Sequence, residues 1–200
     1  MLPVRQITSR LTKTRAIGVI MLVLLLLSAL TRADAAALTS SDKASAADAP
    51  KTVARDFLKW YKANRERLDK FDLVFGKPGD STQAYRVNFA ETEKYLAEIK
   101  NSGFVSDKYI NSFRKYFITA DATLEQYPQY DGPAQGFGFD LVLKAHDYGE
   151  ILDHLKKVKF ITKPGTNGTM KVYVRFPGIV MVLVLSKSGG SWLIDSLDYV

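Results

Sequence analysis

Asp140, His146 and Asp147 form the acidic–imidazole cluster that this chain offers for chemistry. A histidine beside a carboxylate can carry out general acid–base catalysis, because burial and neighbouring charges tune the pKa values of both groups. If Asp140 lies on a strand, His146 shares its face only when that strand continues past Lys144. The structural alternative is that Asp147 caps a short helical turn over 148–156 and that His146 is exposed beside it.

Metal and cofactor sites find little support in the sequence. His146 and His154 stand at twice the four-residue spacing of zinc ligands on a helix, and Gly149 between them weakens a continuous helix. The absence of cysteine excludes disulfides, thiolate nucleophiles and iron–sulfur clusters. No phosphate-binding glycine loop, dinucleotide fingerprint or serine-hydrolase motif occurs. We therefore predict no metal ligands and no cofactor.

Aromatic side chains in a loop rich in glycine and proline are the second candidate site. Tyr127, Tyr130 and Phe137 lie there without the periodicity that demands burial. Aromatics in such a loop can line the mouth of a cavity or a protein interface, or they can close the open end of the fold as plugs. The sequence predicts that a ligand or partner contacts these three residues together with Asp147 and Tyr148.

Three helices are predicted ahead of the strands. Apolar residues at three-to-four spacing predict an amphipathic helix over 51–71. Asn88 with Glu91 resembles a capping box that starts a second helix, which ends near Lys100. Ser106 or the aspartate after it starts a third helix, and its inward stripe is mostly aromatic: Tyr109, Ile110, Phe113, Tyr116 and Phe117.

Short apolar or alternating runs then predict strands, at 139–143, 158–162, 170–176, 179–185 and 191–200. Asn167-Gly168 is a strong signal for a tight hairpin turn. Hairpin-linked strands after a helical half indicate an α+β fold, with N-terminal helices packed on a curved antiparallel sheet. We expect Trp60 from the first helix and Trp192 from the last strand to be largely buried between the two layers.

The first 35 residues predict an export signal. A basic stretch that ends at Arg15 precedes the uncharged apolar residues 16–30, and Ala33-Asp34-Ala35 matches the pattern that is cleaved after Ala35. The sixteen uncharged residues between Arg15 and Arg32 would make a helix of about 24 Å, which is shorter than a bilayer core of about 30 Å. Cleavage two residues later and an uncleaved anchor are the alternatives.

The domain organisation follows from that leader. Residues 36–49 are rich in alanine, serine and aspartate and predict a flexible spacer, and residues 50–200 predict a single domain. We expect the protein to be exported, either to the periplasm or into the medium. A membrane would then be contacted only through an uncleaved signal.

Net charge does not predict a nucleic-acid partner. The formal net charge is +7, but residues 1–35 hold 5 of the 28 basic and 1 of the 21 acidic side chains. The other residues therefore carry 23 basic and 20 acidic side chains, a net charge of +3. Such a value is ordinary for a soluble domain.

Three segments carry a family resemblance: Asp56-Phe57-Leu58-Lys59-Trp60-Tyr61, Phe139-Asp140 to His146-Asp147-Tyr148, and Gly190-Ser191-Trp192-Leu193-Ile194-Asp195. The chain resembles the secreted bacterial proteins of domain-of-unknown-function group 3828, which have the nuclear-transport-factor-like cone fold. The resemblance implies a long helix across a curved antiparallel sheet and an exported address. That group often shows Gln-Asp where this chain has His146-Asp147, and it has no settled activity.

The sequence leaves two classes of function open. The first is a non-catalytic binding or accessory protein of the bacterial envelope, which engages a protein partner or a small apolar ligand. An immunity protein would belong with this class. The alternative is a cofactor-free enzyme of the cone fold that uses Asp140 and His146 for acid–base chemistry. Fold analogy does not decide between them, because one architecture hosts many functions.

Overall fold

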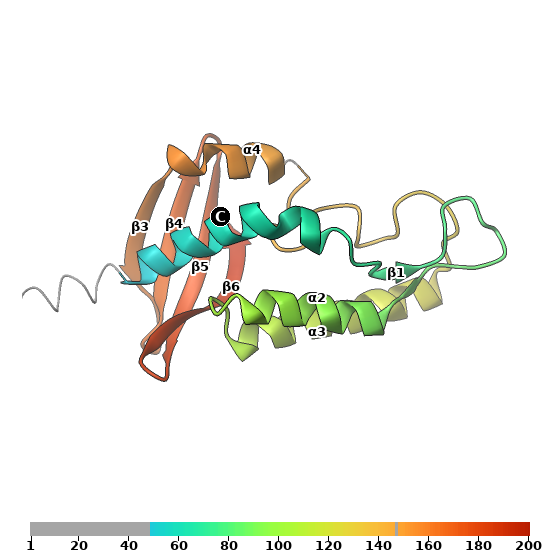
Figure 1. Cartoon of the computed structure of the whole chain (residues 1–200), viewed down its shortest axis with the longest axis horizontal. Coiled ribbons are helices and arrows are strands. Elements are labelled where there is room, and N and C mark those ends of the chain that lie inside the picture. The colour runs from blue at the N-terminus through green and yellow to red at the C-terminus, as the bar shows by residue number, and fades with distance from the viewer. Residues whose placement is uncertain (1–48, 147) are drawn as a thin grey trace, which may run out of the picture. The chain divides into compact units, whose positions relative to one another are not determined.

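A computed structural model describes residues 49–146 and 148–200 (Figure 1). The predicted signal peptide at 1–35 with its cleavage at Ala35, the spacer up to residue 48, and Asp147 lie outside the described residues. The first helix covers residues 49–68, and the later elements are β1 (Val74–Phe75), β2 (Arg86–Val87), α2 (Phe89–Asn101), α3 (Asp107–Gln126), α4 (Tyr148–Asp153), the 3-10 helix η1 (His154–Lys156), β3 (Lys159–Pro164), β4 (Met170–Phe176), β5 (Ile179–Ser188) and β6 (Ser191–Tyr199).

The strands confirm the predicted α+β class. β3, β4, β5 and β6 form one sheet in chain order, and each strand is antiparallel to its neighbour. Asn167 and Gly168 connect β3 to β4 with φ angles of 52° and 73°. Positive φ at both central residues is what a tight turn between right-twisted strands requires, so the predicted hairpin is confirmed.

Side chains alternate between two faces of this sheet. Val172 and Val174 of β4 are fully buried on the face that we call inner, whereas Lys171 and Tyr173 belong to the outer face. A bulge in β6 changes this alternation, because Val184 pairs with Ser196 while its neighbour Leu185 pairs with Ile194. The extra residue allows Ile194 and Leu197, three positions apart, both to be buried.

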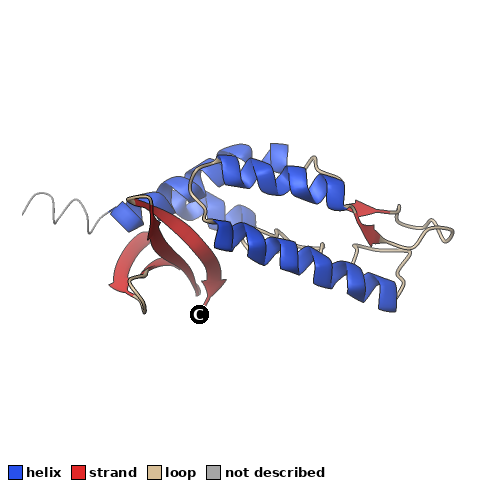
Figure 2. Ribbon diagram, turned by 90° about the horizontal axis from the view of Figure 1, so that it is seen from below, coloured by secondary structure: helices blue, strands red, loops and turns tan. Residues whose placement is uncertain are grey.

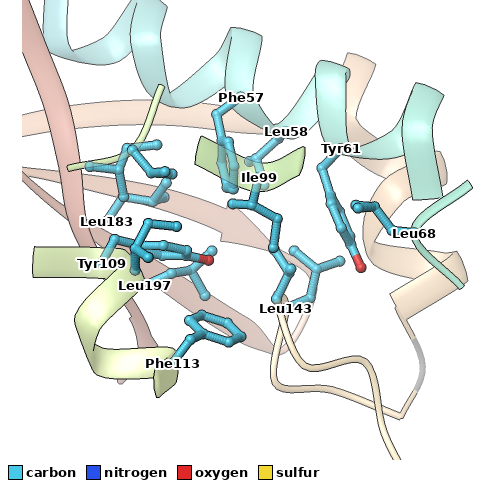
Figure 3. Packing of buried hydrophobic residues seen from close by; sticks show 14 of the residues in the cluster. Phe57, Leu58, Tyr61, Leu68, Ile99, Tyr109, Phe113, Leu143, Leu183 and Leu197 are labelled. Carbon is cyan, nitrogen blue, oxygen red and sulfur yellow. The ribbon is translucent and has the colours of Figure 1, made fainter. Parts of the chain in front are cut away.

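The first helix and α4 lie over one side of the sheet, as Figures 1 and 2 show from perpendicular directions. Phe57 and Leu58 of the first helix are fully buried and point toward sheet residues such as Leu183 (Figure 3). The two predicted caps are confirmed, because the side chain of Asn88 accepts a hydrogen bond from the amide of Glu91 and that of Ser106 accepts one from the amide of Tyr109.

The link between α2 and α3 protects one edge of the sheet. The Ser106 amide donates to the Ile194 carbonyl at 2.9 Å, and the Ile194 amide donates to the Phe104 carbonyl at 2.8 Å. This short parallel pairing occupies backbone groups of β6 that an edge strand would otherwise expose. The start of α3 is therefore fixed directly against the last strand.

The strand predicted at 139–143 is wrong. These residues form a turn, in which Asp140 and Ala145 exchange their two backbone hydrogen bonds at 3.0 and 3.3 Å. The side chain of Asp140 also accepts a hydrogen bond from the Leu143 amide at 2.8 Å. Aspartate side chains favour turns in this way, because they offer the backbone an alternative to a strand ladder.

The prediction that both tryptophans are largely buried is confirmed only in part. Trp60 and Trp192 are half-buried at the margin of the core. Phe57 and Tyr61 occupy the inward positions of the first helix, and the helical period then turns Trp60 toward the margin. Trp192 pairs with Lys187 close to the β5–β6 turn, and the ammonium of Lys187 lies 5.7 Å from the Trp192 ring centroid.

Alanine substitutions on the first helix test this packing. Phe57→Ala should lower the free energy of unfolding by about 3–5 kcal/mol, the usual cost of truncating a buried aromatic side chain. Trp60→Ala should cost less than Phe57→Ala, because the Trp60 side chain is only partly buried at the margin of the core. Urea unfolding followed by far-UV circular dichroism measures both losses. A larger loss at Trp60 than at Phe57 would contradict the helix orientation.

Candidate functional site

Two hollows flank the turn at 139–145. The first has a volume of about 470 Å³ and lies between α3 and the turn. The second has a volume of about 480 Å³ and lies between the first helix, α2 and the same turn. Phe139 and Leu141 line both hollows, so the turn forms the wall between them. Its position therefore shapes both candidate sites.

Asp140 fixes that turn to the first helix. Its side chain is only 2% exposed. One carboxylate oxygen accepts the Leu143 amide, and the other accepts the Tyr61 hydroxyl at 2.7 Å. The Nε of Arg65 lies 3.6 Å from this second oxygen. Because Tyr61 and Arg65 stand one helical turn apart, both reach the same carboxylate from one face of the helix.

Burial and neighbouring charges set the protonation states of Asp140 and Tyr61. Burial raises the pKa of Asp140, and the hydrogen bonds from Leu143 and Tyr61 and the charge of Arg65 only partly oppose it. Burial also raises the pKa of Tyr61, and the charge of Asp140 raises it further. Tyr61 therefore keeps its proton and is the donor in this hydrogen bond.

Arg65 links the second hollow to α4. Its guanidinium carbon lies 3.7 Å from the centroid of the Tyr148 ring, and its terminal nitrogen contacts the Asp69 carboxylate at 2.7 Å. A guanidinium stacked on an aromatic face is held in one orientation. Tyr148, one of the predicted ligand contacts, therefore covers Arg65 and lines the second hollow.

His146 lies on the other side of the turn. It is exposed, contacts the ring of Phe139 edge-on at 5.9 Å and lines the first hollow. The described partners of the Asp140 carboxylate are Leu143, Tyr61 and Arg65, and His146 is not among them. The described contacts therefore do not couple the two candidate catalytic residues.

The predicted loop aromatics divide into two groups. Phe137 is half-buried and stacks on Phe117 with ring centroids 6.1 Å apart, which matches the plug alternative. Tyr127 and Tyr130 are 63% and 40% exposed. They follow α3, and the Tyr130 carbonyl accepts a hydrogen bond from the amide of Gly79, between β1 and β2, at 3.1 Å. Their exposure fits a contact surface, but Phe137 belongs to the core beside α3.

Sequence reasoning missed several residues of these hollows. Arg65 and Tyr61 could have been found together, since their spacing puts them on one helix face. Lys144 carries no local signal, yet it adopts a φ of 50°, an uncommon conformation for a residue other than glycine. An ion pair with Asp198 holds its side chain, and Lys144 lines the first hollow.

Metal ligation and membrane crossing are not features of the described residues. No group of three or more histidine, aspartate or glutamate side chains in 49–146 and 148–200 is placed to hold a metal ion. None of the helices in these ranges combines the length and apolar character that a membrane span needs.

The pH dependence of stability distinguishes Asp140 from an ordinary ion-paired carboxylate. A raised pKa means that ionisation of Asp140 costs free energy in the folded state, so its contribution to stability falls as pH rises through the carboxyl range. Relative to Asp140→Asn, the wild type should therefore lose stability as pH rises from about 4, the ordinary pKa of an aspartate. Urea unfolding at several pH values from acid to neutral measures the difference.

Asp121 supplies the matched control with the opposite sign. Its hydrogen bonds from Arg86 lower its pKa, and the Val87 amide acts in the same direction. Relative to Asp121→Asn, the wild type should lose stability as pH falls below about 4, because a lowered pKa confines the change to pH values below the ordinary pKa of an aspartate. Slopes of equal sign for Asp140 and Asp121 would show that burial does not govern the Asp140 carboxyl.

Comparisons with protein-family models, with curated proteins and with solved structures find no match to this chain. The resemblance to the exported group and to its cone fold therefore stays a prediction.

Proposed function

We propose that the chain is an exported binding protein that holds a small amphiphile with an acidic group in the first hollow. The observation that carries the proposal is the pairing of apolar walls with a polar rim that holds the Lys144 ammonium and the His146 imidazole. Phe113, Tyr116 and Leu141 contribute to the walls, whereas Lys144 and His146 lie at the same hollow. Its volume of about 470 Å³ is in the range of small-molecule sites.

The rim charge is accessible to a ligand. The Lys144–Asp198 pair is exposed, with 47% and 60% of the two side chains accessible. Exposed ion pairs contribute little free energy, so an acidic ligand that also buries its tail can replace Asp198 as the partner of Lys144. The Ser112 hydroxyl lies at the same hollow and adds a polar group beside the apolar wall.

One observation favours the enzyme alternative. Asp140 lines the second hollow, and burial raises its pKa, as in many catalytic acids. Against this, both oxygens of the carboxylate already accept hydrogen bonds, from Leu143 and from Tyr61. Each oxygen keeps a further lone pair, but only 2% of the Asp140 side chain is exposed, so little of it is open to a substrate, as a general base must be. Binding in the first hollow is therefore the function that the geometry supports best.

Titration with decanoate, and with decanol as its uncharged analogue, tests the proposal. Calorimetry should detect decanoate binding, and the double variant Lys144→Asn, His146→Gln should weaken it by at least about tenfold, because hydrogen bonds to a charged group contribute about 1.5–3 kcal/mol each. Asparagine tolerates the positive φ at position 144. The melting temperature should stay close to that of the wild type.

The matched control changes the same residue types elsewhere, at Lys62 and His154. Lys62→Gln, His154→Gln should bind decanoate like the wild type, because neither side chain lines the first hollow. Equal affinity for decanol and decanoate, equal weakening by the two double variants, or no decanoate binding at millimolar concentration would each contradict the proposal.

A further inference from the structure

The outer face of the sheet concentrates positive charge on β3 and β4. Lys159 and Lys163 of β3, and Lys171 and Arg175 of β4, alternate with inward residues such as Val172 and therefore belong to the outer face. The register places Lys159 directly opposite Arg175, and Lys163 directly opposite Lys171. The two pairs thus bring four cationic side chains together on two neighbouring strands.

These pairs are unfavourable on their own. Like charges directly opposite each other on antiparallel strands destabilise a sheet. Within the described part of the chain, none of the four side chains forms an ion pair. Only Lys163 has a described electrostatic contact, with the ring of Tyr173 at 5.4 Å. An anionic partner on this face would relieve the repulsion.

The sequence around the pairs contains no acidic residue to offset them. From His154 to Ile194 the chain has no aspartate or glutamate, and it has seven basic residues: Lys156, Lys157, Lys159, Lys163, Lys171, Arg175 and Lys187. Because residues 36–200 carry only 23 basic and 20 acidic side chains, the rest of that region is net negative. The modest net charge therefore hides two strongly basic strands, β3 and β4, although β6 of the same sheet carries Asp195 and Asp198.

An apolar strip separates the two charged pairs. Ile161 pairs with Tyr173, and Tyr173 pairs with Val182, so the three side chains form a row across β3, β4 and β5. In Figures 1 and 2 the described helices lie on the other side of the sheet. Val182 is buried and Asp198 of β6 continues the row, so Ile161 and Tyr173 are its accessible apolar members. They lie between the cationic pairs on a face that no described helix covers.

We propose that this outer face docks on a lipid bilayer that contains anionic headgroups. Lysine and arginine stems can extend to the headgroup phosphates while the apolar strip contacts the interface. A nucleic acid would use the same charges, but it offers nothing to the aliphatic members of the strip. The proposal is independent of the ligand hollow, because none of its residues lines that hollow.

A site-specific label tests the contact in the full chain. Because the chain has no cysteine, Ser196→Cys on the outer face and Ile118→Cys on α3 each accept one environment-sensitive fluorophore. Vesicles of 70% phosphatidylcholine and 30% phosphatidylglycerol are the probe. The label at position 196 should respond to these vesicles and not to pure phosphatidylcholine, and 0.5 M NaCl should reverse the response. The label at position 118 should not respond.

Charge removal identifies the residues responsible. Substituting glutamine for Lys159, Lys163, Lys171 and Arg175 should weaken the response at position 196 several hundredfold, since each basic residue near an anionic surface contributes about fivefold. The control makes the same change of charge at Lys59, Lys70, Lys77 and Lys115, which are exposed outside the sheet. This control variant should keep most of the response of the label at position 196. Because both quadruple variants carry the same N-terminal residues, any contribution from those residues is common to them.

Three results would overturn the proposal. The first is an equal response of the labels at positions 196 and 118 to anionic vesicles. The second is equal weakening by the two quadruple variants. The third is a response at position 196 to a 20-base-pair DNA duplex but not to vesicles, which would assign the face to a nucleic acid. Thermal unfolding of each variant confirms that it is folded.

Discussion

The hydrogen bond between Tyr61 and Asp140 is the contact on which the rest of the structure depends. It joins residues 79 positions apart and connects the first helix to the turn at 139–145. The same carboxylate holds the Leu143 amide inside the turn, and Arg65 approaches it from the helix. A buried carboxylate is costly unless donors surround it, and here each donor comes from an element that the contact positions. Asp140 thus holds the first helix and the turn at 139–145 together.

Both hollows depend on the hydrogen bond between Tyr61 and Asp140. The turn separates the two hollows, because Phe139 and Leu141 line both of them. The hydrogen bond between Tyr61 and Asp140 holds this turn in place. The interaction that resembles an acid–base site is therefore the one that builds the binding site next to it. A ligand in the first hollow would contact groups whose positions are fixed before it arrives, which lowers the entropic cost of binding. The basic outer face of the sheet would give the same protein a surface for an anionic membrane.

Local signals predicted the fold and only part of the site. Side-chain alternation and Asn167-Gly168 located the hairpins, and the caps at Asn88 and Ser106 started the helices, because these signals act over a few residues. The turn at 139–145 was not predicted, since its short apolar run resembles a strand and its partner Tyr61 lies far away in sequence. The facing charges of β3 and β4 were not predicted from the sequence, for a related reason. A net charge contains no information about strand register, which alone brings those side chains together.

A double-mutant cycle between Tyr61 and Asp140 tests the central claim most directly. Unfolding in urea gives the free energies of the wild type, Tyr61→Phe, Asp140→Ala and the double variant. If the contact joins the first helix to the turn, the losses should be non-additive by about 1.5–3 kcal/mol, the usual range for a hydrogen bond to a charged group. Losses that add to within about 0.5 kcal/mol would show that the two residues act independently, and would contradict the account.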